Sequence, residues 1–383
     1  MASNFNSGAT HNDGTCIYPN ASIVPVSLWN LDSVLTETSG LVFWNHQLWT
    51  HNDNGVTNVY SLDTIDGTIL QVYPINGVVN VDWEEIAQDD NYFYVGDFGN
   101  NTNGNRIDLK ILRIEKNSVL NNAPVVDTIS FAYSDQSNFT PTGANNTDYD
   151  CEAFIVSTDS IYLFTKQWVT NRTRIYALGK TPGNHSATFM DELNVAGMIT
   201  GATFLEQQRL IVLSGYSNLL QPFIYLLYDF SGNDFFNGNK RKISISMSFH
   251  QVEGIASSDG LKYYISNEYF SNPPLPIVQQ KLHILDLSTF LLHYLNKLTL
   301  DIPKLTDRQK ILVYPNPSEE FIIVKAEESF YPLKYSIVNQ VGQLISAGEL
   351  ANASSVIDIQ AIPAGLYWFG SMGYRQQFVK IQN

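Results

Sequence analysis

Carboxylate and amide side chains recur along this sequence at the ends of short apolar strands, where such groups could hold a cation or transfer a proton. They belong to one repeated unit. A start that usually carries a carboxylate leads into an apolar strand, a tight polar turn and an aromatic strand that ends on polar residues. Five copies span residues 39–53, 85–97, 152–166, 200–214 and 253–268. A repeat of this kind predicts that its polar positions converge at one place in the fold.

The polar positions are predicted to share one rim, because the start of the first strand and the end of the second lie together in an antiparallel hairpin. Clustered carboxylates without a balancing arginine cluster repel one another unless a cation or protons intervene. Oxygen-rich sets with few His or thiol ligands suit Ca²⁺ or Mg²⁺ better than zinc. The residues at these positions are Glu37 or Ser39, Asp53, Glu84 or Glu85, Asp97, Asp150, Glu152, Lys166, Ser214, Glu253, Asn267 and Glu268.

Within this set we predict a divalent-metal site and a small catalytic group. His51, two residues before Asp53, is the best placed of the seven histidines for proton transfer. Lys166 could orient an anionic substrate group or could neutralise a neighbouring carboxylate. The predicted metal ligands are Glu85, Asp97, Glu152, Glu253, Asn267 and Glu268.

Structural roles compete with each of these assignments. A glutamate at a strand start could accept backbone N–H bonds from the neighbouring blade and hold the ring together, and a histidine near a strand end is often structural. The fourth copy has Thr200 and Ser214 in place of acids, which predicts an asymmetric site. The oxygen-rich run 97–105 could bind calcium, but its spacing differs from an EF-hand loop and favours a solvated turn.

The alternation of apolar and polar residues has period two, which indicates strands rather than a helical solenoid. Corresponding positions Gly40, Ile86, Ala153, Gly201 and Gly254 lie 46 to 67 residues apart, close to the length of four-stranded propeller blades. The longest step predicts an insertion within 115–149. We predict an all-β fold in which residues 1–20 form a flexible leader and residues 21–300 a five- or six-bladed β-propeller. Its third strands are expected at 59–62, 109–112, 174–178, 224–228 and 282–285, and residues 23–28 could pair with the last blade and close the ring.

Composition narrows the range of partners. The 383 residues are 44% hydrophobic and can bury a large core, while the formal net charge of −15 makes nucleic acid an unsuitable partner. There is no apolar stretch long enough to span a membrane. Cys16 and Cys151 could form a disulfide or remain two free thiols. The sequence lacks a Gly-x-Ser-x-Gly elbow, a His-Glu-x-x-His motif, a phosphate loop and a Cys-x-x-Cys pair, and we expect a monomer.

Residues 301–310 are charged and break the pattern, which predicts a linker, and residues 311–383 predict a small seven-stranded Ig-like β-sandwich. The motifs Val-Tyr-Pro-Asn-Pro-Ser at 313–318, Val-Asn-Gln-Val-Gly-Gln at 338–343 and Pro-Ala-Gly-Leu-Tyr at 363–367, with a closing Lys380, closely resemble the C-terminal sorting domain of type IX (Por) secretion substrates in Bacteroidetes. The middle motif departs mildly, with Asn339 or Gln340 where the family usually has Asp.

The resemblance implies that the type IX machinery is a partner and that the protein is extracellular or on the outer-membrane surface. It also implies that the tail is cleaved on release or on attachment to surface lipopolysaccharide. The N-terminus lacks the charged and apolar regions of an export signal, so we expect that signal to be missing from the sequence given.

The starts Glu253-Gly254-Ile255-Ala256 and Glu84-Glu85-Ile86-Ala87 resemble the propellers of phytase-like esterases and the gluconolactonase type. That resemblance implies metal-bound water acting on esters, lactones or phosphoesters, with Asp53 as base. The alternative is a non-catalytic surface module that binds a small molecule, a glycan or a protein. In it Trp49, Trp83 and Trp168 would provide stacking surfaces, unless they pack between blades.

Overall fold

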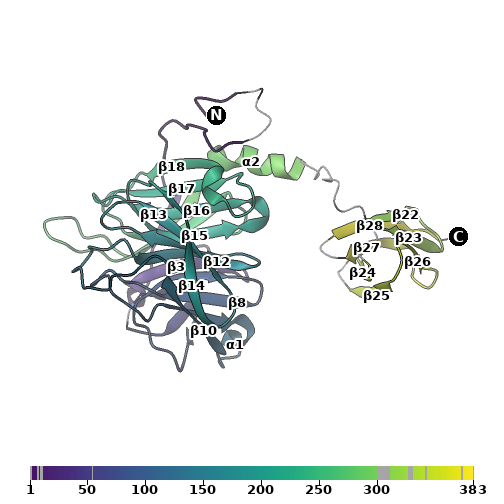
Figure 1. Cartoon of the computed structure of the whole chain (residues 1–383), viewed down its shortest axis with the longest axis horizontal. Coiled ribbons are helices and arrows are strands. Elements are labelled where there is room, and N and C mark those ends of the chain that lie inside the picture. The colour runs from purple at the N-terminus through teal and green to yellow at the C-terminus, as the bar shows by residue number, and fades with distance from the viewer. Residues whose placement is uncertain are drawn as a thin grey trace. The chain divides into compact units, whose positions relative to one another are not determined.

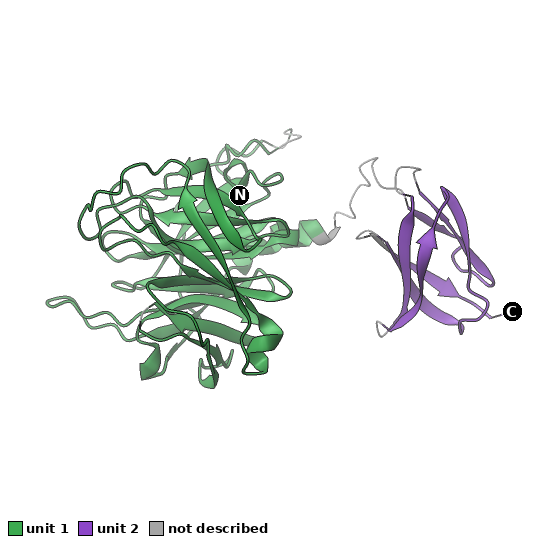
Figure 2. Cartoon of the chain, turned by 60° about the horizontal axis from the view of Figure 1, so that its bottom comes forward, with its two compact units in different colours: residues 1–298 green, residues 299–383 purple. Residues whose placement is uncertain are grey.

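The computed structural model describes residues 2–6, 8, 12–53, 55–300, 311–326, 331–340, 343–371 and 374–382 (Figure 1). The chain forms two compact units, residues 1–298 and residues 299–383, which are coloured separately in Figure 2. Both units consist mainly of β-strands. The predicted linker, residues 301–310, lies outside the described residues.

The first unit is built from antiparallel sheets of four strands. Consecutive strands pair with one another within each sheet, and the N-terminal segment adds an outer strand to each of the last two sheets. The bounds are β3 (Thr38–Trp44), β4 (Gln47–Asn52), β5 (Asn58–Leu62) and β6 (Ile69–Pro74); β7 (Trp83–Gln88), β8 (Tyr92–Asp97), β9 (Lys110–Glu115) and β10 (Val126–Tyr133); β11 (Asp150–Val156), β12 (Ser160–Lys166), β13 (Thr173–Gly179) and β14 (Gly183–Leu193); β15 (Met198–Leu205), β16 (Leu210–Tyr216), β17 (Pro222–Tyr228) and β18 (Asn239–Ile245); β19 (Val252–Ser257), β20 (Lys262–Asn267) and β21 (Lys281–Asp286).

The first strand of each sheet lies at the centre of the unit. Strands β3, β7, β11, β15 and β19 contact one another in this order, and β19 contacts β3, so they close a ring. At the outside, β10 pairs in parallel with β14 and joins two sheets into one of eight strands. Sheets arranged radially around one axis form a β-propeller. All the predicted third strands are confirmed, as β5, β9, β13, β17 and β21.

The N-terminal segment completes the last sheet. Strand β2 (Ser27–Asn30) pairs antiparallel with β21, from Ser27 opposite Ile284 to Asn30 opposite Lys281. The pairing was expected for residues 23–28, so the strand lies a few residues later than predicted. Ile23 instead belongs to β1 (Ser22–Ile23), which pairs in parallel with β18. The β2 pairing covers the edge that β21 would otherwise expose.

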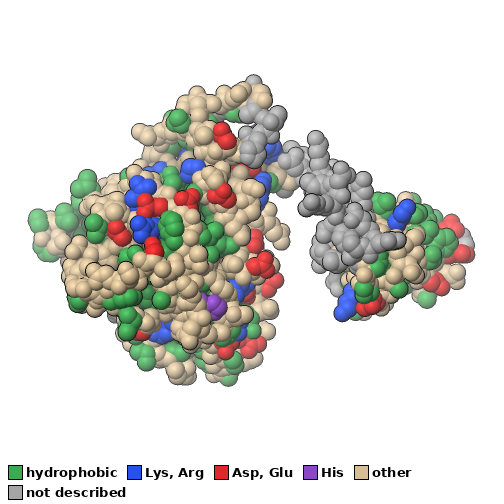
Figure 3. Space-filling model, viewed as in Figure 1, with side chains coloured by type: hydrophobic (Ala, Val, Ile, Leu, Met, Phe, Trp, Pro, Cys, Tyr) green, Lys and Arg blue, Asp and Glu red, His purple; other side chains and the backbone are tan. Residues whose placement is uncertain are grey.

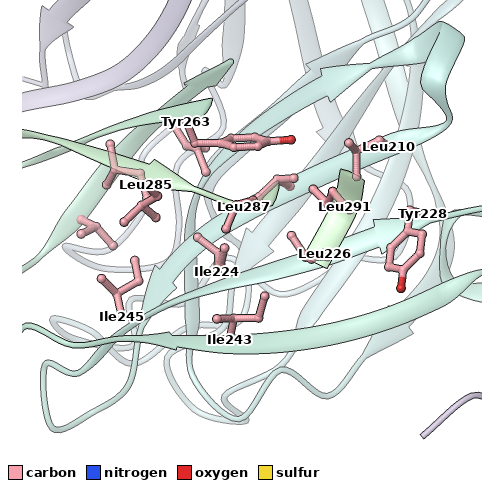
Figure 4. Packing of buried hydrophobic residues seen from close by; sticks show 14 of the residues in the cluster. Leu210, Ile224, Leu226, Tyr228, Ile243, Ile245, Tyr263, Leu285, Leu287 and Leu291 are labelled. Carbon is pink, nitrogen blue, oxygen red and sulfur yellow. The ribbon is translucent and has the colours of Figure 1, made fainter. Parts of the chain in front are cut away.

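Neighbouring sheets pack through apolar side chains. Figure 4 shows Ile224 and Leu226 of β17 and Ile243 of β18 beside Leu285 and Leu287. Helix α2 (Ser288–Leu300), which the strand pattern did not predict, adds its buried Leu291 to this cluster. The remaining helices are α1 (Lys116–Leu120) within the predicted insertion and the 3₁₀ turns η1 (Ser33–Leu35), η2 (Glu206–Gln208) and η3 (Phe235–Asn237).

Two of the three predicted stacking tryptophans, Trp49 and Trp83, belong to a separate hydrophobic cluster between the first two sheets. The Trp49 ring stacks on Tyr73 at 5.1 Å between ring centroids and lies 5.1 Å from Phe93, and Trp83 is fully buried. They pack between sheets and have no exposed face for a ligand. Cys16 and Cys151 are free thiols and do not form a disulfide with each other.

The second unit has two sheets that share one hydrophobic cluster, which includes Val324, Ile337 and Phe369. One sheet is β22 (Leu312–Tyr314), β23 (Phe321–Lys325) and β26 (Ser354–Asp358). The other is β25 (Leu344–Leu350), β24 (Leu333–Asn339), β27 (Gly365–Ser371) and β28 (Tyr374–Lys380). Throughout the described part of the chain, no helix is both long and apolar enough to cross a membrane.

Candidate functional site

Every first strand of the propeller carries a β-bulge where it begins. The register shifts between Thr38 and Leu41, and the same kind of shift occurs in β7, β11, β15 and β19. A bulge leaves an extra residue unpaired and re-aims its side chain. The residues at the equivalent bulge position are Ser39, Glu84, Glu152, Thr200 and Glu253, so the sheets contribute one polar side chain each to a ring at one rim.

The bulges correct the predicted register in the second sheet. Sequence spacing aligned Ile86 with Gly40, but the strand pairing aligns Ile86 with Leu41. Glu84 is therefore the counterpart of Ser39, and Glu85 lies where the first sheet has Gly40. The prediction was wrong by one residue because the inserted residue breaks the period-two count.

The two hydroxyl members of the ring hold neighbouring sheets together. Ser39 Oγ donates a hydrogen bond to the backbone carbonyl of Glu84, and Thr200 Oγ1 donates one to the carbonyl of Val252. Both bonds cross from one sheet to the next. The other three bulge residues are Glu84, Glu152 and Glu253. Among the described interactions, their carboxylates make no hydrogen bond of this kind to a backbone carbonyl of the next sheet.

Glu85 closes the axis of the propeller. Its Oε1 accepts hydrogen bonds from the N–H of Leu41 at 3.2 Å and of Ile86 at 3.0 Å, and its Oε2 accepts from the N–H of Ala202 at 2.8 Å. The side chain is fully buried and joins β3, β7 and β15. Burial raises the pKa of Glu85 well above its ordinary value, although the three N–H donors lower it. Glu85, a predicted metal ligand, thus has the stapling contacts that competed with that role.

Lys166 lies among the buried acids. Its Nζ is 2.5 Å from Glu152 Oε2, 4.7 Å from the Trp168 ring centroid and 5.3 Å from the Tyr216 ring centroid. Burial alone would lower the pKa of Lys166, but Glu152, Tyr216 and Glu253 raise it well above its usual value. Of its two predicted roles, these contacts favour neutralisation of a neighbouring carboxylate.

Glu84 and Asp82 form a close pair of carboxyl groups above Gly99. A Cβ atom at residue 99 would lie 2.2 Å from Glu84 Oε1 and 2.3 Å from Asp82 Oδ2, so only glycine leaves room for both. Burial, with Glu152 and Asp82 nearby, raises the pKa of Glu84 well above its usual value. Burial and the charge of Asp150 raise the pKa of Asp82 to about 6. The pair is therefore poised to hold a proton.

The run 97–105 consists of a buried first part that supports the site and a turn that exposes Thr102 and Asn103. Phe98, Gly99 and Asn100 are buried. Asp150 accepts a hydrogen bond from the Asn100 N–H at 2.6 Å and another from Trp168 Nε1 at 2.7 Å. The prediction of a solvated turn therefore holds around Thr102 and Asn103, but not for residues 97–100, which are buried.

Two predicted metal ligands have other partners. Asp97 Oδ1 lies 2.9 Å from Arg106 Nη2, and its Oδ2 lies 2.8 Å from Lys110 Nζ, so this carboxylate is balanced by cations that the sequence pattern had not revealed. The Asn267 amide donates to the carbonyls of Glu268 at 2.7 Å and Gln279 at 2.9 Å, and its oxygen lies 2.7 Å from His283 Nε2.

Three carboxylates form a separate cluster nearer the solvent. One oxygen each from Glu37, Asp53 and Glu268 lies within 4.8 Å of the other two, and all three residues are partly buried. A backbone hydrogen bond from the Asp53 N–H to the Glu37 carbonyl, 3.0 Å long, joins two of the segments. Burial, together with Glu253, Asp53 and Glu37, raises the pKa of Glu268 well above its usual value.

Glu253 interacts electrostatically with Glu268 of this outer cluster and with Lys166. Its Oε2 is buried and has no hydrogen-bond partner among the described residues. Burial raises the pKa of Glu253 to about 7 although Lys166 lowers it. We call the whole acidic region the acidic mouth and define it by Glu37, Asp53, Asp82, Glu84, Asp150, Glu152, Glu253 and Glu268 with Lys166.

His51 lies in the core between the first two sheets. Its Nδ1 is 3.1 Å from the Asn52 carbonyl, and its ring packs edge-on against Trp83 with 5.6 Å between centroids. Burial lowers its pKa to about 4, so the imidazole is neutral near pH 7. Ser214, another predicted rim residue, donates to the Glu253 carbonyl at 3.4 Å. Sequence reasoning missed Asp82, which precedes the bulge by two residues.

The fold and the site together define a β-propeller protein with an acidic mouth at one end of its axis. Its C-terminal segment is identified more closely: residues 312–380 match the family described as the secretion system C-terminal sorting domain. This confirms the resemblance seen in the sequence. The chain is therefore a β-propeller protein exported by the type IX system to the cell surface or beyond. No curated protein matches the sequence.

Solved structures resemble the chain only distantly. PorZ, an essential surface component of the type IX secretion system of Porphyromonas gingivalis, is 11% identical, with a TM-score of 0.31. The match covers 90% of this chain and 45% of PorZ, so the chain spans less than half of that protein. A putative oxidoreductase (glucose dehydrogenase) from Thermus thermophilus is 8% identical over 68% of this chain and 99% of its own, with a TM-score of 0.38. The Cps50 (Swd1) propeller domain of Myceliophteria thermophila is 10% identical over 66% of this chain and 88% of its own, with a TM-score of 0.35.

Proposed function

We propose that this protein is a surface-exported five-bladed β-propeller whose acidic mouth binds a divalent cation, with Ca²⁺ preferred to Mg²⁺. The closed order of contacts among β3, β7, β11, β15 and β19 supports the count of five blades. The two sheets around one hydrophobic cluster support an Ig-like sandwich for the tail, which engages the secretion machinery.

The outer cluster carries this proposal. Glu37, Asp53 and Glu268 come from three separate segments, yet their oxygens lie within 4.8 Å of one another. Ca²⁺ accepts six to eight oxygen ligands in flexible geometry, and such carboxylates suit it better than they suit a transition metal. The ligand set differs from the one predicted from sequence: Asp53 becomes a ligand, Glu268 remains one, and Glu37 is added.

Hydrolysis of esters, lactones or phosphoesters is the activity that this site could support. A bound cation would polarise a carbonyl or phosphoryl oxygen. Asp53 cannot serve as base while it holds the cation, and His51 is buried among core residues. The close carboxyl pair of Asp82 and Glu84, and Glu253 with its unpartnered Oε2, are groups at this rim that could accept a proton.

Terbium luminescence and calorimetry with Ca²⁺ would test the proposal on the purified full chain. We expect one site, with affinity lowered at least about tenfold by Asp53→Asn or Glu268→Gln because each removes a charged ligand. Asp90→Asn, which removes an exposed carboxylate outside the mouth, is the matched control. Equal binding by all variants, or no binding by the wild type, would contradict the proposal.

Turnover needs its own assay. Lactone, aryl-ester and phosphoester substrates should be tried with Ca²⁺ and with chelator. If cation binding is seen without chelator-sensitive hydrolysis, the protein is a binding module and the hydrolase function is wrong.

A further inference from the structure

We propose that the rim around the acidic mouth is a docking surface for a partner protein segment that carries a lysine or arginine flanked by aliphatic side chains. This inference goes beyond cation binding, because it concerns the loops outside the carboxylates. It follows from two independent features of the rim: its exposed aliphatic residues and the excess of carboxyl groups over the single lysine, Lys166, in the mouth.

The aliphatic residues lie in the loops at the end where the first strands begin. These are the loops between β4 and β5, β6 and β7, β8 and β9, β12 and β13, and β16 and β17. They expose Val56, Val79, Val81, Ile107, Val169 and Leu219, and the exposed fraction reaches 80% for Ile107 and 83% for Leu219. In the described residues of the loops at the opposite end, the large apolar side chains that are exposed are Ile65, Leu120 and Val125.

The loops place these side chains around the acidic mouth rather than at one edge of it. Val79 and Val81 immediately precede Asp82, Ile107 follows the loop that carries Gly99, and Val169 follows Trp168. Leu219 comes three residues after Tyr216, which faces Lys166. Exposed apolar side chains thus come from loops of several sheets at the same end of the propeller as the acidic mouth.

The charge of the centre selects the partner. Glu152 is paired with Lys166, and Asp97 is paired with Arg106 and Lys110. No ion pair is recorded for Glu84, Glu253 or Asp82 within the described part of the chain. A bound Ca²⁺ would offset two negative charges and leave the mouth acidic. Elsewhere the surface is mixed: on the face in Figure 3, basic and acidic side chains lie side by side on the larger unit.

The chemistry of the rim favours protein over the other macromolecules. Nucleic acid and anionic lipid carry the wrong charge for an acidic centre. Sugar rings stack best on aromatic faces, but the aromatic residues in the rim loops are less exposed than the aliphatic ones: Phe139 and Tyr269 are 39% and 37% exposed, whereas Ile107 and Leu219 reach 80% and 83%. Aliphatic side chains around carboxylates match a basic residue between apolar neighbours on a protein segment.

A random twelve-residue peptide library, selected on the immobilised full chain, tests this inference directly. We expect the enriched peptides to combine Lys or Arg with at least two aliphatic residues. Their affinity should fall about tenfold or more in the double variant Ile107→Ser and Leu219→Ser, because it removes apolar contact area, and again with Glu253→Gln or at high salt. Ile65→Ser with Leu120→Ser, at the opposite end, is the matched control.

Cation binding separates this inference from the proposed function. The Ile107→Ser and Leu219→Ser variant should bind Ca²⁺ like the wild type, since neither residue is near the carboxylate cluster in sequence or carries a ligand atom. Failure of Ca²⁺ binding with intact peptide binding would leave docking in place and remove the metal site. No enrichment, enrichment of acidic peptides, or equal loss in the control variant would overturn the docking surface.

Discussion

At the position of Glu85 the first sheet has Gly40, and the side chain of Glu85 occupies the space that this glycine leaves open. A Cβ at residue 40 would lie 2.3 Å from Glu85 Oε1, so the glycine is needed for the glutamate to enter. The three backbone N–H groups that donate to Glu85 come from three different sheets. One buried side chain therefore connects parts of the ring that are far apart in sequence.

We expect Glu85→Ala to lower the free energy of unfolding by about 2–5 kcal/mol, because it leaves buried N–H groups without an acceptor and opens a cavity. Glu85→Gln should cost less, since it keeps the volume and one acceptor oxygen. Guanidinium denaturation of the full chain measures both. Glu206→Ala is the control: Glu206 also accepts a backbone N–H from another sheet, that of Thr158, but at an exposed site. If Glu85→Ala and Glu206→Ala lowered the free energy of unfolding by similar amounts, the buried position of Glu85 on the axis would not contribute more to stability than an exposed contact between sheets.

The acidic mouth makes stability depend on pH in a direction opposite to most carboxylates. Burial raises the pKa of Glu253 to about 7 and that of Asp82 to about 6, so the folded state holds protons that the unfolded state has lost above pH 5. Stability from these groups is therefore greatest below about pH 4, where the unfolded state also holds the protons, and falls as pH rises to about 7. Glu253→Gln should remove part of this fall and stabilise the protein at pH 8 by roughly 1–3 kcal/mol.

Thermal unfolding with chelator present, at pH 5 and pH 8, measures the effect. Asp90→Asn should keep the wild-type pH dependence. If Glu253→Gln is less stable than the wild type at pH 8, the carboxylate is held ionised by interactions stronger than its burial cost, and the interpretation of the mouth as proton-holding is wrong.

Among the secondary-structure elements, we expect strand β2 to have the largest effect on the stability of the propeller for its length. Its four residues cover the edge of β21 and join the N-terminal segment to the last sheet. Deletion of residues 1–30 should lower the unfolding midpoint markedly and promote aggregation, because it exposes an unpaired strand edge in a ring. Deletion of residues 1–11 serves as the control, and light scattering with chemical denaturation reports both outcomes. A truncated chain as stable as the control would show that the ring does not need this strand.

The strands were predictable from sequence because their apolar residues alternate and turn residues separate them. The third strands and the sequence of tail strands emerge from that pattern alone. The bulges were not predictable: nothing in Glu84-Glu85-Ile86 shows which glutamate faces the rim. Helix α2 was missed since its residues continue an apolar pattern after β21. The site was predicted as a region, whereas the partners of Asp97 and Asn267 depend on Arg106 and His283, which no spacing rule links to them.

At the scale of the whole molecule, the acidic mouth and the sorting domain lie in different units. Residues 312–380 match the sorting domain, while the acidic mouth lies within residues 1–298. The hydrophobic clusters of the two units share no residue among those described, so each unit has a core of its own. We therefore expect residues 1–298 to fold without the tail, with a circular dichroism spectrum and Ca²⁺ affinity like those of the full chain.

Transfer from the periplasm to the cell surface should depend on the tail. In a host with a working type IX system, deletion of residues 311–383 should abolish surface display, measured by antibody labelling of intact cells, while the protein still accumulates inside. Fusion of residues 311–383 to an unrelated folded passenger that carries an export signal to the periplasm should restore display of that passenger. A chain that carries Asp53→Asn and Glu253→Gln but keeps the tail should be displayed like the wild type, since the mouth takes no part in sorting. Unimpaired display without the tail would show that a different segment carries the address.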